Sequence, residues 1–140
     1  MFDSKIVMVV RNFLEPWQEL NVAAFLMSGI IGASPEIIGE PYKDLEGNLH
    51  LPLCQQPVVI LYGHANTLRN IRMRANARGV ITAVYIEEMF KTGNDSANRG
   101  VFSQHGSEMD NTVGIAFRAE KKLADKVSKG AKMQKEIYSM

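Results

Sequence analysis

Cysteine is almost absent from this sequence: Cys54 is the single one among 140 residues, which excludes an internal disulfide. No apolar run approaches the roughly 20 residues of a membrane helix. No small-residue cleavage site follows the N-terminus, so we expect no signal peptide. Histidine and cysteine pairs at metal-ligand spacing and glycine-rich phosphate loops are also missing. These absences predict a cytoplasmic protein that contacts no membrane and binds neither a metal nor a cofactor.

Charge is nearly balanced, with a formal net charge of +1, but it is unevenly distributed. Residues 118–140 hold seven lysines and arginines against three acidic residues, so this part is basic and the preceding part is mildly acidic. Lys122, Lys126 and Lys129 fall on one face of an expected helix and are candidates for weak RNA binding. The alternative is a solvated helical surface, which such a modest charge favours.

A length of 140 residues fits one domain, which we expect to span residues 1–140. Apolar, β-branched runs predict four strands, near 5–11, 57–62, 80–86 and 112–117. Helical patterns predict helices at 17–29, at 66–78 capped by Asn66, at 95–104 capped by Asp95, and along a stripe of Leu123, Val127 and Ala131. Strands that alternate with helices predict a three-layer α/β/α sandwich.

Residues 37–53 interrupt this alternation. Pro41 and Pro52 exclude a central strand, and Glu46-Gly47-Asn48 is typical of a turn. We expect a short hairpin that leaves the main sheet and lies over it. The helix at 17–29 is apolar almost all round, which predicts burial against more than one neighbour.

Several segments resemble, in order, the peptidyl-tRNA hydrolase type 2 family. Val9-Val10-Arg11 followed by Val22-Ala23-Ala24 is similar to its first strand and helix, and Thr112-Val113-Gly114-Ile115-Ala116 is similar to its last strand. Two further phrases, Ile38-Gly39-Glu40-Pro41-Tyr42 and the segment 87–99, more closely resemble the family named domain of unknown function 2000, or DUF2000. The resemblance implies a mixed four-stranded sheet in the order 2-1-4-3, with helices on both faces.

The departures from the hydrolases bear on activity. Asn21 stands where the resemblance places the catalytic lysine, Phe25 where it places a glutamine, and Glu87 where it places a loop aspartate. A lysine offers a fixed positive charge to a developing oxyanion, whereas an asparagine offers only a dipole. Loss of one such donor costs about 3–4 kcal/mol. We therefore expect no peptidyl-tRNA hydrolysis.

Glu87 and Glu88 follow an expected strand, at the end where open α/β sheets form their ligand crevices. Consecutive strand residues point to opposite faces, so only one of the two can face a given pocket. Either carboxylate is a candidate general base or ligand contact. The alternative is that it caps a helix or pairs with Arg11 or Arg99.

Three further residues are candidate ligand contacts. Asn21 lies on an otherwise apolar helix, where a buried amide needs a partner; that partner is either a ligand or a backbone group of the turn 11–16. Thr92 and Arg99 belong to a dense polar loop, and the Arg99 guanidinium suits a carboxylate or phosphate. Asp95 in the same loop is explained by its predicted capping role.

The sequence favours a non-hydrolytic protein that binds a small polar ligand or acts as a regulator. The contacts would come from Asn21, from Glu87 or Glu88, and from Arg99. A hydrolase with Glu87 or Glu88 as general base is the second hypothesis, and weak RNA or tRNA binding is the third. Apolar residues at element ends and the apolar helix 17–29 further predict a homodimer. The alternative is that the excursion 37–53 folds over this apolar patch and leaves a monomer.

Overall fold

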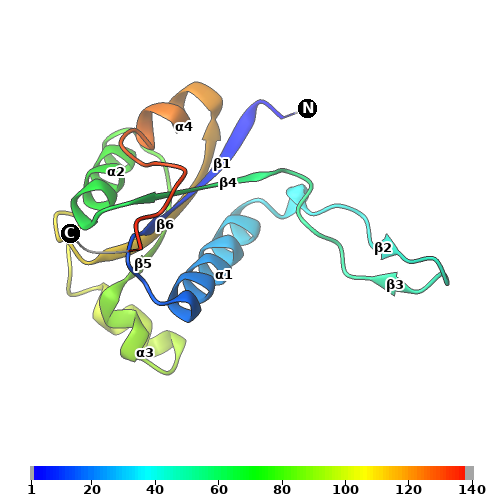
Figure 1. The fold of residues 1–140 in the computed structure, drawn as a ribbon, viewed down its shortest axis with the longest axis horizontal. Coiled ribbons are helices and arrows are strands. Elements are labelled where there is room, and N and C mark those ends of the chain that lie inside the picture. Colours follow the sequence, from blue (N-terminus) through cyan, green and yellow to red (C-terminus); the bar gives the residue numbers. More distant parts are fainter. Residues whose placement is uncertain (1, 138–140) are drawn as a thin grey trace.

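The computed structural model describes residues 2–137, and its centre is a four-stranded mixed sheet (Figure 1). In sheet order the strands are β4 (Val58–Gly63), β1 (Ser4–Arg11), β6 (Thr112–Glu120) and β5 (Ala83–Ile86). β1 and β4 run parallel, while β6 is antiparallel to its neighbours β1 and β5. Counted over these four strands, the predicted order 2-1-4-3 is confirmed.

Helices cover both faces of the sheet. They are α1 (Pro16–Ala33), α2 (Ala65–Ala77) and α4 (Lys121–Val127). Because strand side chains alternate between faces, Ile6, Met8 and Val10 of β1 join the core under α1. Val7 and Val9 join the second core, under α2 and α4. The described chain is therefore an α/β/α sandwich, as predicted.

A glycine lets α1 lie close to the sheet. Val22 and Leu26 of α1 are buried and lie over Gly114 of β6. A Cβ atom at Gly114 would overlap the Val22 side chain and come within 2.9 Å of Leu26 Cδ1. The absence of a side chain at Gly114 therefore sets the distance between α1 and β6.

The outer surface of α1 is open to solvent. The prediction that this helix is buried against more than one neighbour is wrong, because the sheet covers one face and, among residues 2–137, no second element covers the opposite one. Three large apolar side chains of the helix are more than half exposed: Trp17, Leu20 and Phe25.

Residues 38–54 form an arm that projects away from the sandwich (Figure 1). It contains the short strands β2 (Tyr42–Lys43) and β3 (Leu49–His50), which pair antiparallel. The expected hairpin is therefore present, but the prediction that it lies over the sheet is wrong. The chain is anchored at the base by the buried Ile37, the last residue of the 3-10 helix η1 (Pro35–Ile37), and continues outward from there.

Hydrogen bonds give the arm its order. At the base, Ile38 and Cys54 form an isolated bridge. At the tip, the Asp44 carboxylate accepts hydrogen bonds from the backbone N–H groups of Glu46, at 3.1 Å, and of Asn48, at 2.9 Å. Its second oxygen lies 2.8 Å from His50 Nε2. The arm is thus held by polar contacts rather than by a core of its own.

Two helix caps differ from the predicted ones. α3 (Asp95–Phe102) begins after Asn94, whose side chain accepts a hydrogen bond from the Ala97 N–H at 2.8 Å. Asn94 is the cap because it has the extended backbone that a cap needs, whereas Asp95 is already helical. Likewise, α2 begins after His64, so Asn66 lies inside its first turn.

The segment after α4 returns along the edge of the sheet. α4 ends at Val127 and does not reach Ala131, because Gly130, with φ of +102°, turns the chain. Tyr62 of β4 and Lys132 then exchange two backbone hydrogen bonds, of 2.7 and 2.8 Å. Within residues 2–137, no helix has the length and apolar character needed to cross a membrane.

Candidate functional site

A groove opens where α1 approaches α3 and the 3-10 helix η2 (Glu87–Lys91). Its lining includes a row of four aromatic rings. Ring centroids lie 5.9 Å apart for Trp17 and Phe90, 5.1 Å for Phe90 and Tyr85, and 5.8 Å for Tyr85 and Phe25. These tilted and edge contacts are the favoured arrangement of aromatic pairs. The groove consists of two adjoining hollows of about 310 and 590 Å³.

Uncharged polar side chains line the same groove. Asn21 comes from α1, Thr92 from the loop after η2, and Asn98 from α3. The Thr92 hydroxyl donates to the Met89 carbonyl oxygen at 2.9 Å and also contacts the Asn98 side chain. The groove therefore combines an apolar wall with amide and hydroxyl groups.

Arg99 lines the larger of the two hollows. Its guanidinium Nε donates to the Asp95 carboxylate at 2.7 Å, and both side chains are more than three-quarters exposed. Such an exposed pair, four residues apart on a helix, contributes little to stability, because solvent screens it. Asp95 lines both hollows too, so the groove holds this carboxylate beside the guanidinium. The structure thus brings Asn21, Thr92 and Arg99 together around one groove.

The two glutamates occupy a different place, at the end of β5. Neither is among the groove residues. Glu87 forms an ion pair with Arg11 of β1. Glu88 accepts a hydrogen bond from the Asn111 side chain at 3.0 Å and lies 3.4 Å from His105 Nε2. The side-chain oxygen of Asn111, Oδ1, is buried without a hydrogen-bond partner among the described residues.

Hydrogen bonds and charge favour the ionised form of Glu88. Burial raises the pKa of its carboxyl, but this effect is outweighed by hydrogen bonds from its own backbone N–H and from Asn111. The charges of His105 and Arg11 act in the same direction, so the pKa of Glu88 lies below its ordinary value.

Comparison with known proteins places the chain in a family. The model described as "Protein of unknown function (DUF2000)" matches residues 4–135. The chain belongs to the DUF2000 family. It is 50% identical to a protein of unknown function from Agrobacterium tumefaciens, whose solved structure it matches with a TM-score of 0.94 over 96% of this chain and 99% of that chain. No curated protein matches it. The resemblance to peptidyl-tRNA hydrolases stays a prediction.

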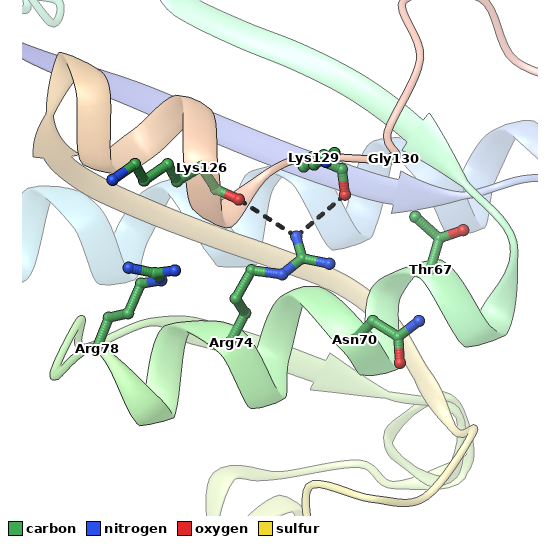
Figure 2. A pocket seen from close by; sticks show the side chains of 7 residues that line it. All are labelled: Thr67, Asn70, Arg74, Arg78, Lys126, Lys129 and Gly130. Atoms are coloured by element: carbon green, nitrogen blue, oxygen red, sulfur yellow. Dashed lines mark hydrogen bonds between the residues drawn. The ribbon is translucent and has the colours of Figure 1, made fainter.

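A second, basic groove of this DUF2000 protein lies between α2 and α4 (Figure 2). It has a volume of about 620 Å³, and Arg74, Arg78, Lys126 and Lys129 line it together with neutral residues and no acidic one. Arg74 Nη1 donates to three carbonyl oxygens: those of Lys126 at 3.3 Å, Val127 at 2.7 Å and Lys129 at 3.1 Å. Two of the three predicted lysines thus join two arginines, whereas Lys122 is not in the lining.

Sequence reasoning missed part of the aromatic groove. Tyr85 lies in the third predicted strand and is buried like an ordinary core residue. Its position in a strand therefore gives no indication of its contact with the Phe90 ring. Phe25 follows Asn21 by four residues and so shares its stripe of α1. That spacing was the available signal, but a stripe alone does not indicate which element faces it.

Proposed function

We propose that this DUF2000 protein binds a small polar ligand that carries a flat ring, and that it does not hydrolyse it. The supporting observation is the groove beside α1, where four aromatic rings and uncharged hydrogen-bonding groups line one space. Apolar walls with a few placed polar groups are typical of small-molecule sites. Asn21 and Thr92 would orient the ligand, and Arg99 would bind an anionic substituent.

Hydrolysis with Glu87 or Glu88 as general base has less support. Each carboxylate has a protein partner, and neither belongs to the groove. A general base works best when its pKa is near the working pH, whereas the pKa of Glu88 is lowered. The neutral Asn21 in the groove also lacks the charge that would stabilise an oxyanion. These features favour binding over hydrolysis.

The single tryptophan makes the proposal testable, because Trp17 belongs to the aromatic row. Protein labelled with 5-fluorotryptophan has one ¹⁹F label, and we expect its signal to shift saturably with at least one probe among nucleobases, nicotinate and indole-3-acetate. Asn21→Leu should lower the affinity for that probe about tenfold, because a hydrogen bond to the ligand is lost.

The matched control is Asn76→Leu, which changes an exposed asparagine on α2, away from the groove. It should leave probe binding unchanged. The proposal fails if no probe shifts the signal, or if Asn21→Leu binds the probe as tightly as the wild type. Turnover of an ester probe that disappears in Glu88→Gln would instead favour the hydrolase.

A second candidate function is binding of phosphate groups in the basic groove between α2 and α4. It is favoured by four cationic side chains without a carboxylate in the lining, and by the fixed position of Arg74. We expect pyrophosphate to bind measurably by calorimetry, and tRNA to bind weakly and without preference over other RNA. RNA affinity should fall with salt by about 0.9 log units per log unit for each duplex phosphate contact.

Arg78→Gln combined with Lys129→Gln should abolish pyrophosphate binding, whereas Lys91→Gln, an exposed lysine outside the groove, should not. Equal binding by both variants would exclude this site. A sub-micromolar, tRNA-specific complex at physiological salt would show RNA recognition instead of a small-anion site.

For the compartment we propose the cytoplasm, since the single Cys54 is a free thiol.

A further inference from the structure

The arm of residues 38–54 exposes large apolar side chains. The exposed fraction is 98% for Leu45, 85% for Leu51 and 69% for Leu49, and more than half for Tyr42 and Leu53. Exposed leucines forgo the stabilisation that burial of apolar surface gives, and an isolated two-stranded hairpin is marginally stable at best. Within residues 2–137 the arm has no apolar cover of its own, so its side chains need one from outside.

A matching surface runs along α1, on the flank away from the aromatic groove. Leu20, Ala24, Met27 and Ile31 follow one another at helical spacing and form what we call the α1 stripe. Leu20 is 71% exposed. An exposed helical face ordinarily carries charged residues, yet α1 has none after Glu19. Met27 and Ile31 are half-buried and pack against the core below, whereas Leu20 and Ala24 are exposed. The α1 stripe is therefore an uncharged face whose outer part, at Leu20 and Ala24, is open to solvent.

The edge strand β4 extends this face. Ile60 pairs with Met8 across the parallel ladder and so points to the α1 side of the sheet, where it is 43% exposed. The arm cannot cover this surface in its own chain, because its base is fixed by the bridge between Ile38 and Cys54 and the arm projects outward from there.

The same arm occurs in a second protein. The arm makes up more than a tenth of the chain, and the Agrobacterium structure matches with a TM-score of 0.94 over 96% of the chain. A match of that quality requires the arm to follow a similar course in both proteins. The extended course of the arm is therefore not peculiar to this chain.

We infer that the arm of one copy docks on the α1 stripe of a second copy, in a two-fold symmetric homodimer. Two-fold symmetry pairs each arm with the stripe of the other copy, so both apolar faces of the chain are covered at once. A stable interface buries about 800 Å² on each partner. The five exposed side chains of the arm, with Leu20 and Ile60, form the apolar part of that area.

Light scattering tests the dimer. At tens of micromolar we expect about twice the chain mass of 15.6 kDa. Leu45→Ser combined with Leu51→Ser should give the monomer mass with an unchanged circular dichroism spectrum, because both side chains are exposed within one copy. Leu20→Ser should weaken dimerisation at least tenfold. Ile81→Ser is the matched control: its side chain is 92% exposed but lies outside the arm and the stripe, so the dimer should persist.

A wild-type mass near 15.6 kDa would overturn the inference. So would a dimer that survives the double arm variant, or one whose affinity is unchanged by Leu20→Ser, because the copies would then meet through other surfaces. The ligand groove lies on the other flank of α1 and is probed by Trp17, so dimer formation and ligand binding can fail separately.

Discussion

Replacing Gly114 by alanine adds one methyl group between β6 and α1, where no space exists for it. The new Cβ would overlap Val22 and lie 2.9 Å from Leu26 Cδ1, and both side chains are at most 2% exposed. Overpacking of a core costs about 1–3 kcal/mol. Alanine also restricts the unfolded chain, which contributes about 0.4–1 kcal/mol in the opposite direction. We expect the free energy of unfolding to fall by about 1–2 kcal/mol.

Gly32→Ala is the matched control, because it is the same substitution in the helix that Gly114 contacts. A Cβ atom at Gly32 has no neighbour within 4 Å. Alanine in a helix is favoured over glycine by about 0.5–1 kcal/mol. The two variants should therefore move the stability in opposite directions.

Urea and thermal unfolding measure both variants. For small and medium-sized domains, a change of 1 kcal/mol in the free energy of unfolding corresponds to roughly 2–8 °C in melting temperature. Gly114→Ala should therefore melt several degrees lower than the wild type, and Gly32→Ala slightly higher. If Gly114→Ala is as stable as the wild type, α1 does not lie against β6 as closely as described. If Gly32→Ala is destabilised, the outer face of α1 is covered more tightly than one copy of the chain allows.

Three further predictions concern single side chains. Burial, together with the hydrogen bond to Glu19, raises the pKa of Tyr62 from 10.0 to about 12. The stability that the protonated hydroxyl contributes is therefore fully present below pH 10 and is lost as the pH rises towards 12. Tyr62→Phe should make the free energy of unfolding fall less steeply with pH over this range. The pKa of Glu88 is lowered from 4.5, so the stability that its carboxylate contributes is present above that pH and is lost as the pH falls below it. Glu88→Gln should make the free energy of unfolding depend less on pH in this acidic range. Arg74→Met removes hydrogen bonds to the end of α4 and should cost about 1–3 kcal/mol in urea unfolding; an unchanged midpoint would show that the arginine is not needed there.

The centre of the sheet was predictable because its two central strands are buried on both faces over most of their length. Such strands appear in the sequence as continuous apolar runs, and those at 5–11 and 112–117 give the two central strands β1 and β6. The run at 80–86 misleads in part. β5 begins only at Ala83, and Ile81 is 92% exposed. An apolar residue in such a run is not always hydrogen-bonded to a neighbouring strand.

The candidate site was predictable only in part, because its composition depends on contacts between distant elements. Asn21, Thr92 and Arg99 were predicted separately, from a helix position and from a loop, and the fold places them around one groove. Glu87 and Glu88 begin η2 beside the groove, but their carboxylates contact Arg11 at the end of β1 and Asn111 just before β6. No local pattern in the sequence carries that pairing.

The return of the chain along β4 also bears on solubility. Edge strands with free N–H and C=O groups pair readily with other chains and start aggregation. The two hydrogen bonds between Tyr62 and Lys132 occupy part of that edge, next to the exposed Ile60. A chain shortened before Ala131 would leave the edge open. It should aggregate on heating at concentrations that the full chain tolerates, even though none of residues 131–137 has a buried side chain.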